Sequence, residues 1–337
     1  MSETIMVTGG SGFIGSNFIR YLINNFDVRV INLDALTYAG NPENLHDIET
    51  NSKYKFVHGE IQNKKLVLEI IEKYNIEGII NFAAESHVDR SIMDSRPFIE
   101  TNITGTLNLL EAARELKIKK YLQISTDEVY GSLGQTGKFT EQTPISPNSP
   151  YSASKASADH LVMAFVNTYN LPAMITRCSN NYGQYQFPEK LIPLMILNAI
   201  ENKKLPVYGD GLNVRDWIHV SDHCSAIWAV YNKGKIGEVY NVGGNCEKSN
   251  IEIVKSILSI LGKSESLIQY VKDRPGHDRR YAIDSTKIET QLGWSHEINF
   301  EKGLENTVKW YIENPQWCGN VRSGKYLDYY KKQYEES

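Results

Sequence analysis

Short apolar runs alternate with stretches of helical spacing along the first half of the chain. Between the first two runs, Ile14, Phe18, Leu22 and Phe26 recur every four residues, which places one apolar stripe along a helix. The runs themselves are almost continuously apolar, as strands buried on both faces are. This alternation predicts a parallel sheet covered by helices on both faces, a doubly wound α/β fold. The predicted strands are Ile5–Val7, Val28–Asp34, Tyr54–His58, Gly78–Ala83, Lys120–Ser125 and Ala173–Arg177.

After about Arg177 the pattern becomes less regular, and the chain predicts a smaller mixed α/β domain. We expect helices over 189–201, where Pro193 must be tolerated, and over 221–231, 251–261 and 301–313, with a strand over 238–242. The first domain is placed at 1–180, with a returning segment near 219–245, and the second at 181–337. No linker marks the boundary, so we expect the two domains to interleave.

The composition is that of an ordinary folded protein of one or two domains, with 337 residues. Its 36 basic and 40 acidic side chains give a net charge of −4 without a long basic block, which argues against binding to nucleic acid or to a membrane. The N-terminus lacks the features of a secretory leader, and the apolar stretch from Leu191 to Ile200 is too short for a membrane span. Four widely spaced cysteines predict reduced thiols and no metal site. We therefore expect a cytoplasmic protein.

A glycine-rich loop stands between the first predicted strand and the first helix. Gly10, Gly12 and Gly15 fit one dinucleotide-binding fingerprint, and Gly9 with Gly12 and Gly15 fits a relative of it. Glycines let backbone N–H groups approach a pyrophosphate at a helix N-terminus. Asp34 ends the second strand, where its carboxylate can accept from a ribose diol and repel a 2′-phosphate, so NAD is favoured over NADP. The alternative is a loop that serves only as a tight turn.

Tyr151 and Lys155 share one face of a helix that Ser149 can cap and that has Pro150 in its first turn. A nearby ammonium stabilises a phenolate, so the pair predicts a tyrosine whose pKa falls from about 10 toward working pH. Such a tyrosine can remove the proton of an alcohol. Among 20 tyrosines a pair at this spacing also arises by chance, but its position after the dinucleotide half favours catalysis.

Thr126, Asp127 and Glu128 follow a predicted buried strand, at the sheet edge where open parallel sheets bind ligands. The threonine can contact the same alcohol oxygen as Tyr151. Different surroundings can separate the pKa values of the two carboxyl groups, leaving one as acid and the other as base. The alternative interpretation is a pair of solvated loop acids, or an aspartate that caps a helix.

Together these motifs resemble the extended short-chain dehydrogenase/reductase superfamily, and within it the NAD-dependent epimerase/dehydratase family. The resemblance covers nearly the whole chain. Its acid pair after Thr126 is the distinguishing part, because related epimerases have small residues there. The matching segments are the glycine loop, 34–41 (DALTYAGN), 83–91 (AAESHVDRS), 125–131 (STDEVYG), 151–155 (YSASK), 179–183 (SNNYG), 187–191 (FPEKL), 215–217 (RDW) and 273–278 (DRPGHD).

The resemblance implies a lyase of deoxysugar biosynthesis that converts dTDP-glucose to dTDP-4-keto-6-deoxyglucose and water. The sugar would be oxidised at C4 by NAD+, lose water across C5 and C6, and regain the hydride at C6. Tyr151, activated by Lys155 and assisted by Thr126, would take the proton of the 4-hydroxyl. Glu128 would remove the C5 proton, and a protonated Asp127 would donate to the departing 6-hydroxyl.

The resemblance also implies two sets of binding residues. The set for NAD is Gly9, Gly12, Phe13, Ile14, Gly15, Asp34, Ala35, Leu36, Thr37, Glu60, Ile61, Phe82, Ala83, Ala84, Ser86, Thr101, Tyr151, Lys155 and Asn181. The set for the sugar nucleotide is Ser86, Thr126, Asn180, Lys190, Leu191, Pro206, Val207, Tyr208, Arg215, Asn250, Asp273, Arg274 and His277. For His277, a ligand contact and a purely structural role stay equally open.

Three features depart from the family pattern. Glu60 stands where an aspartate is usual, Gln184 replaces a proline, and the segment 131–141 is short. Two other readings of the function stay open. One is a related enzyme, either a UDP-hexose 4-epimerase or a dehydratase of a GDP- or CDP-sugar, and the other is a catalytically inactive NAD-binding sensor.

The resemblance implies a homodimer, formed through a bundle of helices that includes the Tyr151 helix. The apolar residues Leu161, Val162, Phe165 and Val166 on that helix fit packing within the subunit equally well.

Overall fold

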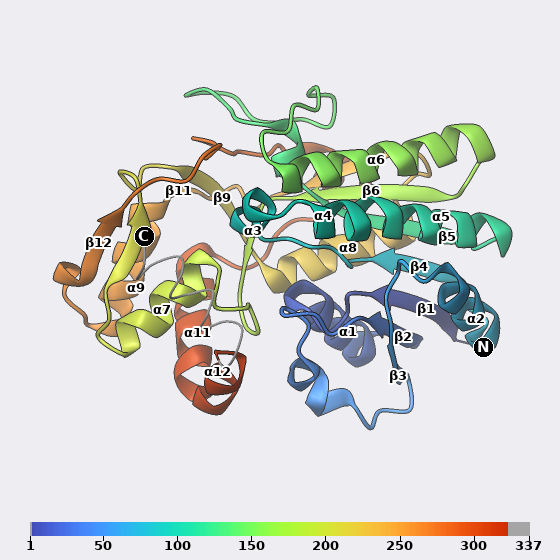
Figure 1. The fold of residues 1–337 in the computed structure, drawn as a ribbon, viewed down its shortest axis with the longest axis horizontal. Helices are drawn as coiled ribbons and strands as arrows, with labels where there is room; N and C mark the ends of the chain where they lie inside the picture. Colours follow the sequence, from blue (N-terminus) through green and yellow to red (C-terminus); the bar gives the residue numbers. More distant parts are fainter. Residues whose placement is uncertain (1, 323–337) are drawn as a thin grey trace.

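A seven-stranded, all-parallel sheet forms the centre of the computed structural model, which describes residues 2–322 (Figure 1). The strand order is β10-β6-β5-β4-β1-β2-β3. The predicted doubly wound α/β fold with a smaller second domain is therefore confirmed. The strands of the sheet are β1 (Glu3–Thr8), β2 (Val28–Asp34), β3 (Tyr54–His58), β4 (Gly78–Asn81), β5 (Lys120–Thr126), β6 (Ala173–Cys178) and β10 (Val239–Val242).

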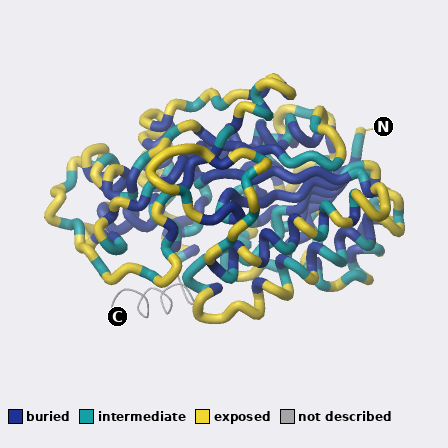
Figure 2. Tube along the Cα trace, turned by 90° about the horizontal axis from the view of Figure 1, so that it is seen from above, coloured by how far each residue is buried: buried dark blue, intermediate teal, exposed yellow. Residues whose placement is uncertain are grey.

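Helices cover both faces of this sheet because its side chains alternate between two apolar clusters. Ile5 and Val7 of β1 pack with one cluster, whereas Met6 between them packs with the other. Figure 2 shows the strands as the buried centre of the molecule. The first cluster contains residues of α1 (Phe13–Asn25) and α8 (Val220–Lys233), and the second contains residues of α2 (Lys64–Tyr74), α5 (Thr106–Glu115) and α6 (Pro150–Tyr169).

The smaller half has its own apolar cluster and two small sheets. One sheet has the order β11-β9-β7, and the other pairs β12 with β8. Its strands are β7 (Asn180–Tyr182), β8 (Leu205–Tyr208), β9 (Val214–His219), β11 (Glu247–Ser249) and β12 (Ile268–Val271). Its helices are α7 (Leu191–Ile200), α9 (Asn250–Leu261), α11 (Phe300–Glu313) and α12 (Pro315–Val321), while α10 (Thr286–Leu292) packs on α8 and β10.

Short helical segments complete the chain, and most of them lie in the connections of the first half. They are η1 (Pro42–Ile48), α3 (Val88–Met93), α4 (Arg96–Phe98), η2 (Ile99–Gly105), η3 (Asp127–Tyr130) and η4 (Glu265–Leu267).

The chain crosses between the halves more than once. After β9 it returns to the main sheet, where α8 packs against α1 and β10 pairs in parallel with β6. This returning stretch lies within the segment near 219–245 that the sequence singled out. A cut at one point of the chain therefore does not separate the two halves.

Several predicted elements have slightly different ends in the structure, and two of these differences bear on the site or on a proline. The strand expected over Gly78–Ala83 ends at Asn81, so Phe82 and Ala83 leave the sheet and line a cavity. The helix expected from residue 189 begins at Leu191, which places Pro193 in its first turn. A proline is tolerated there because the first N–H groups of a helix have no partner within it.

Candidate active site

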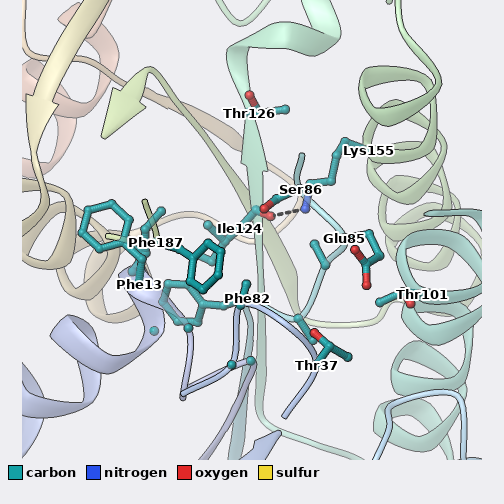
Figure 3. A pocket seen from close by; sticks show the side chains of 18 of the residues that line it. Phe13, Thr37, Phe82, Glu85, Ser86, Thr101, Ile124, Thr126, Lys155 and Phe187 are labelled. Atoms are coloured by element: carbon teal, nitrogen blue, oxygen red, sulfur yellow. Dashed lines mark hydrogen bonds between the residues drawn. The ribbon is translucent and has the colours of Figure 1, made fainter. Parts of the chain in front are cut away.

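A cavity of about 330 Å³ lies at the carboxyl edge of the main sheet, where the loops after β1, β2, β4 and β5 meet α6. Open parallel sheets bind their ligands at this edge. In Figure 3, Phe13, Phe82 and Phe187 gather on one side of the cavity, apart from Lys155. The structure brings into its lining all the predicted cofactor residues except Leu36, and all the predicted catalytic residues, which are Thr126, Asp127, Glu128, Tyr151 and Lys155.

The glycine loop turns Gly9, Gly12 and Gly15 to the cavity, whereas Gly10 lies outside the lining. Gly9 has φ +69°, and a Cβ there would lie 2.6 Å from the nitrogen of Ala83. A Cβ at Gly15 would lie 2.4 Å from the Gly9 carbonyl oxygen, so α1 packs closely on the loop. Gly12 is the N-cap of α1, and a Cβ there would meet nothing closer than 3.4 Å. The glycines at the cavity are thus those of the wider-spaced fingerprint, Gly9, Gly12 and Gly15. The space at Gly12, at a helix N-terminus, suits a pyrophosphate.

Asp34 closes the loop from the end of β2. Its two carboxylate oxygens accept hydrogen bonds from the N–H groups of Ser11 and Leu36, both at 2.8 Å. Burial raises the pKa of this carboxyl group, and the two bonds oppose that shift. Each oxygen retains a lone pair for the hydroxyls of a ribose. Leu36 itself lies outside the cavity lining, and its backbone N–H orients Asp34.

Tyr151 and Lys155 enter the cavity from the first turns of α6. Ser149 caps this helix through a capping box, with Pro150 at its first position, as the sequence predicts. The Lys155 ammonium donates to the carbonyl oxygen of Ile124 at 2.7 Å (Figure 3). This bond fixes the ammonium against the end of β5.

The pKa of Tyr151 differs from the sequence-based prediction. Burial raises it well above 10, and the nearby Glu128 acts in the same direction, while a hydrogen bond with Thr126 lowers it. Burial lowers the pKa of Lys155. For the chain on its own, the predicted lowering of the tyrosine pKa is wrong, because desolvation of the phenolate dominates and Glu128 adds to it. Thr126 and Tyr151 both line the cavity, as expected of two hydroxyls that contact one substrate oxygen.

Asp127 is buried, with 1% of its surface exposed, and its Oδ2 has no hydrogen-bond partner within residues 2–322. Burial raises the pKa of this carboxyl group well above its usual range, and the charges of Glu128 and Asp216 act in the same direction. It is therefore not a solvated loop acid. It is not a helix cap either, since the hydroxyl of Thr126 accepts the N–H of Glu128 and caps η3. The surroundings favour a protonated carboxylic acid at Asp127.

Glu128 faces three cations. Burial raises the pKa of its carboxyl group, and the charges of Arg274, Lys190 and Arg215 oppose that shift. The cations favour the ionised form, which can remove a proton. The adjacent carboxyl groups thus lie in surroundings that favour an acid at Asp127 and a base at Glu128.

The predicted sugar-nucleotide residues fall into two groups. Four line the cavity, and they are Ser86, Thr126, Asn180 and Lys190. The others lie outside its lining, and they are Leu191, Pro206, Val207, Tyr208, Arg215, Asn250, Asp273, Arg274 and His277. The charges of Arg215 and Arg274 nevertheless act on Glu128, one of the predicted catalytic residues.

Two of these outer residues are held by the protein itself. The guanidinium of Arg215 donates to the carbonyl oxygens of Val214 and Asp278 and lies over the ring of Tyr281, which leaves further N–H donors for a ligand. The His277 ring lies 2.6 Å from Asp273 Oδ1, and burial lowers its pKa.

Sequence reasoning missed several residues of the lining, among them Cys178, Ser179, Gln186, Phe187 and Glu189. Phe187 and Glu189 belong to a segment that the resemblance singled out, so a signal was present. Cys178 gave none. Its thiol donates to the carbonyl oxygen of Ser125, and burial raises its pKa to about 12, so it stays neutral and packs in the wall.

Two departures from the family pattern now have a structural setting. Glu60 lines the cavity. The carbonyl oxygen of Gln184 accepts a hydrogen bond of 3.1 Å from the Asn17 side chain, which ties this loop to α1.

Known structures share this architecture. A crystal structure of dTDP-glucose 4,6-dehydratase from Bacillus anthracis in complex with NAD is 54% identical, with a TM-score of 0.90, and the match covers 95% of this chain and 100% of that one. The same enzyme from Streptomyces venezuelae, with NAD and TYD (dTDP) bound, is 46% identical with a TM-score of 0.92, covering 94% and 99%. A UDP-glucose 4-epimerase from Thermus thermophilus in complex with NAD is 27% identical, with a TM-score of 0.86, covering 92% and 99%.

The sequence comparisons agree with these structures. The family model described as GDP-mannose 4,6 dehydratase matches residues 6–307. The dTDP-glucose 4,6-dehydratase of Xanthomonas campestris pv. campestris (strain B100) is 54% identical over 96% of this chain and 97% of its own length. The chain therefore belongs to the GDP-mannose 4,6 dehydratase family, and within it to the dTDP-glucose 4,6-dehydratases.

Proposed function

We propose that this chain dehydrates dTDP-glucose to dTDP-4-keto-6-deoxyglucose, with NAD as a recycled cofactor. The observation that carries this proposal is the pair of carboxyl groups at the end of β5. Asp127 is buried and Glu128 is partly buried, both line the cavity with Tyr151, and the balance of charges around them differs. The pair supplies the acid and the base that loss of water requires. Relatives that carry this activity in their names match the chain over almost its whole length.

The glycine loop, Asp34 and the walls of the cavity are the part of the chain that fits NAD. Gly12 leaves room for a pyrophosphate at the start of α1, and Asp34 presents acceptors where a ribose diol would bind. When bound, NAD+ supplies an acceptor for the hydride of C4 and returns it to C6, and its own charge adds to that of Lys155. The chain itself positions the sugar and moves the protons.

The hydroxyls of Tyr151 and Thr126 act on the 4-hydroxyl of the sugar. Both side chains line the cavity, so both can contact one oxygen, and Tyr151 takes the proton. Lys155, fixed by the carbonyl oxygen of Ile124, is the cation that the chain contributes to the phenolate. A ketone at C4 then acidifies the proton on C5.

The acid pair carries out the elimination. Ionised Glu128 removes the C5 proton, and protonated Asp127 donates to the 6-hydroxyl as it leaves as water. Glu128 returns this proton to C5 when C6 is reduced. Lys190, Arg215 and Arg274 surround this point and suit the diphosphate of a sugar nucleotide.

A homodimer in the cytoplasm is the setting we propose for this activity. Ile92, Met93 and Ile99 are exposed apolar side chains on α3 and η2, which pack beside α6. Val162 and Phe165 on α6 are buried in the core of the subunit. All four cysteines are free thiols, as in a reducing compartment, and no helix within residues 2–322 has the length and apolar character of a membrane span.

The test compares dehydration by the wild-type chain with dehydration by Asp127→Asn and Glu128→Gln. Each variant removes one proton-transfer group, so we expect kcat to fall by roughly 10²- to 10⁴-fold while NAD affinity stays within about threefold of wild type. Products are identified after incubation with dTDP-, UDP-, GDP- and CDP-glucose. Glu72→Gln, an exposed carboxyl on α2, is the control.

Other outcomes support the alternatives. A product that keeps its 6-hydroxyl identifies an epimerase, and no turnover on any of the four sugar nucleotides identifies an NAD-binding sensor. Variants that release water at the wild-type rate remove the acid pair from the mechanism.

A further inference from the structure

Helix α3 belongs to the cofactor half, yet it faces the substrate half (Figure 1). The side chain of Asp89, on its first turn, is 12% exposed and reaches two separate segments of that half. Its Oδ2 accepts from the hydroxyl of Tyr208 at 3.1 Å, and its Oδ1 accepts from the guanidinium of Arg274 at 3.1 Å. Tyr208 ends β8, and Arg274 lies in the loop after β12, the strand that pairs with β8. One carboxylate thus holds two residues of the expected sugar-nucleotide site.

The position of Arg274 matters for the chemistry. Its side chain is 18% exposed, and its charge has the largest opposing effect on the raised pKa of Glu128. A guanidinium on a loop has many rotamers, and an ion pair that is mostly buried selects one of them. Asp89 therefore fixes the position of the Arg274 guanidinium before substrate binds.

We propose that Asp89 is a positioning residue for the sugar nucleotide, acting through Arg274 and Tyr208. This inference rests on the proposed function, because it assigns Arg274 to the anionic substrate of that site. The carboxylate holds the guanidinium near Glu128 and, through Tyr208, holds the end of β8 beside it. The substrate site is therefore organised from the cofactor half of the molecule.

A purely structural role would give different results. The neighbouring Arg90 anchors the same helix independently, since its guanidinium lies 3.4 Å from the buried Glu189 carboxylate and stacks on the ring of Tyr38 at 3.9 Å. Loss of Asp89 therefore leaves α3 attached to the smaller half. Stability and NAD binding should change little, whereas substrate binding should weaken.

The experiment measures kcat and KM for dTDP-glucose, the Kd of dTDP and of NAD by calorimetry, and the thermal unfolding temperature. Asp89→Asn keeps an acceptor for Tyr208 but loses the charge that holds Arg274. A charge-assisted hydrogen bond at a mostly buried site corresponds to about tenfold, so we expect KM and the Kd of dTDP to rise by about that factor, with kcat within about threefold. Asp89→Ala should weaken binding further.

The control and a double mutant separate positioning from structure. Glu247→Gln breaks a partly buried ion pair with Arg280 elsewhere in the smaller half and should leave both constants unchanged. In an Arg274→Gln background, Asp89→Asn should have little further effect on the Kd of dTDP, since the two residues act as a unit.

Each result has one meaning. An unchanged Kd of dTDP in Asp89→Asn, or effects of the two substitutions that add fully, overturns the inference. A wild-type chain that binds dTDP but does not turn over dTDP-glucose overturns the proposed function, and the dTDP measurements still decide the role of Asp89. A fall in the unfolding temperature of Asp89→Asn with wild-type KM shows a structural role only.

Discussion

Asp127 and Glu128 are neighbours in the chain, but the balance of charged groups around them differs. The carboxylate of Asp216 lies close enough to Asp127 to raise its pKa, whereas cations oppose the rise at Glu128. Asp216 is itself buried, and burial raises its pKa to about 6. Above that pH Asp216 carries a charge that keeps the proton on Asp127. Burial and Glu128 raise the pKa of Asp127 most, and Asp216, which is not part of the cavity lining, adds to them.

Asp216→Asn tests this dependence through the pH profile of kcat. The proposed mechanism requires Glu128 ionised and Asp127 protonated, so activity should rise with pH on the acid side and fall on the alkaline side as Asp127 loses its proton. Removing the negative neighbour lowers the pKa of Asp127, so the alkaline limb should move to lower pH. The asparagine oxygen still accepts from the Cys246 N–H, as Asp216 does at 2.7 Å.

The acid limb provides the internal control, because Asp216 has no effect of comparable size on Glu128. An alkaline limb that stays in place, or moves to higher pH, contradicts the role assigned to Asp216.

At the scale of elements, the sequence predicted the main sheet well because its strands carry their own signal. All seven predicted strands exist, and the ranges Val28–Asp34 and Tyr54–His58 match β2 and β3 at both ends. A continuous apolar run indicates a strand that is buried on both faces, and this can be recognised without knowing which distant residues pack against it. The ends of elements were harder to predict, as β4 shows, because Phe82 and Ala83 are apolar but line a cavity.

The substrate site was less predictable because its contacts join distant segments. The pair Asp89 and Arg274 is separated by 185 residues, and no periodicity relates them. Arginine and aspartate in loops look like surface charges from the sequence alone. The predicted catalytic residues follow one strand and open one helix, so the sequence could place them in one cavity, whereas their pKa values depend on burial, which only the fold defines.

The glycine loop provides a prediction at this scale, since two of its glycines differ in what surrounds them. A Cβ at Gly12 meets nothing closer than 3.4 Å and the backbone φ is −78°, so Gly12→Ala should cost less than about 1 kcal/mol of stability. The added methyl group occupies the space over the N-terminus of α1, so we expect NAD affinity to fall at least tenfold. Calorimetry and thermal unfolding measure the two effects.

Gly9→Ala is the matched comparison. Its Cβ would lie 2.6 Å from the Ala83 nitrogen at φ +69°, so this variant should lose both stability and NAD affinity. If Gly12→Ala binds NAD like the wild type, the pyrophosphate does not lie over this helix terminus.

At the scale of the whole molecule, the net charge of −4 opposes binding of an anionic sugar nucleotide. Attraction must come from local cations, and Lys190, Arg215 and Arg274 meet around Glu128. These three come from the loop before α7, from β9 and from the loop after β12. The assembled smaller half, and no single segment of it, creates the positive site.

The return of the chain to the main sheet predicts that a fragment of residues 1–180 does not fold. This fragment contains six strands of the sheet and the glycine loop, yet it lacks β10 and α8. Ile227, Val230 and Tyr231 of α8 are fully buried against the α1 face. At about 1.5–3 kcal/mol for each side chain, their loss approaches the whole stability of an ordinary domain, about 5–15 kcal/mol.

The test compares this fragment with a chain of residues 1–322, which keeps every described element. Circular dichroism and the chemical-shift dispersion of NMR spectra report whether each chain is folded. The longer chain should unfold cooperatively and bind NAD, whereas the fragment should show neither property. A fragment with a dispersed spectrum and wild-type NAD affinity would mean that the glycine loop and six strands form an independent domain. The expected result would mean that the cofactor site depends on α8 and β10, which follow β7, β8 and β9 of the substrate half in the sequence. Neither site could then form before both halves of the chain are present.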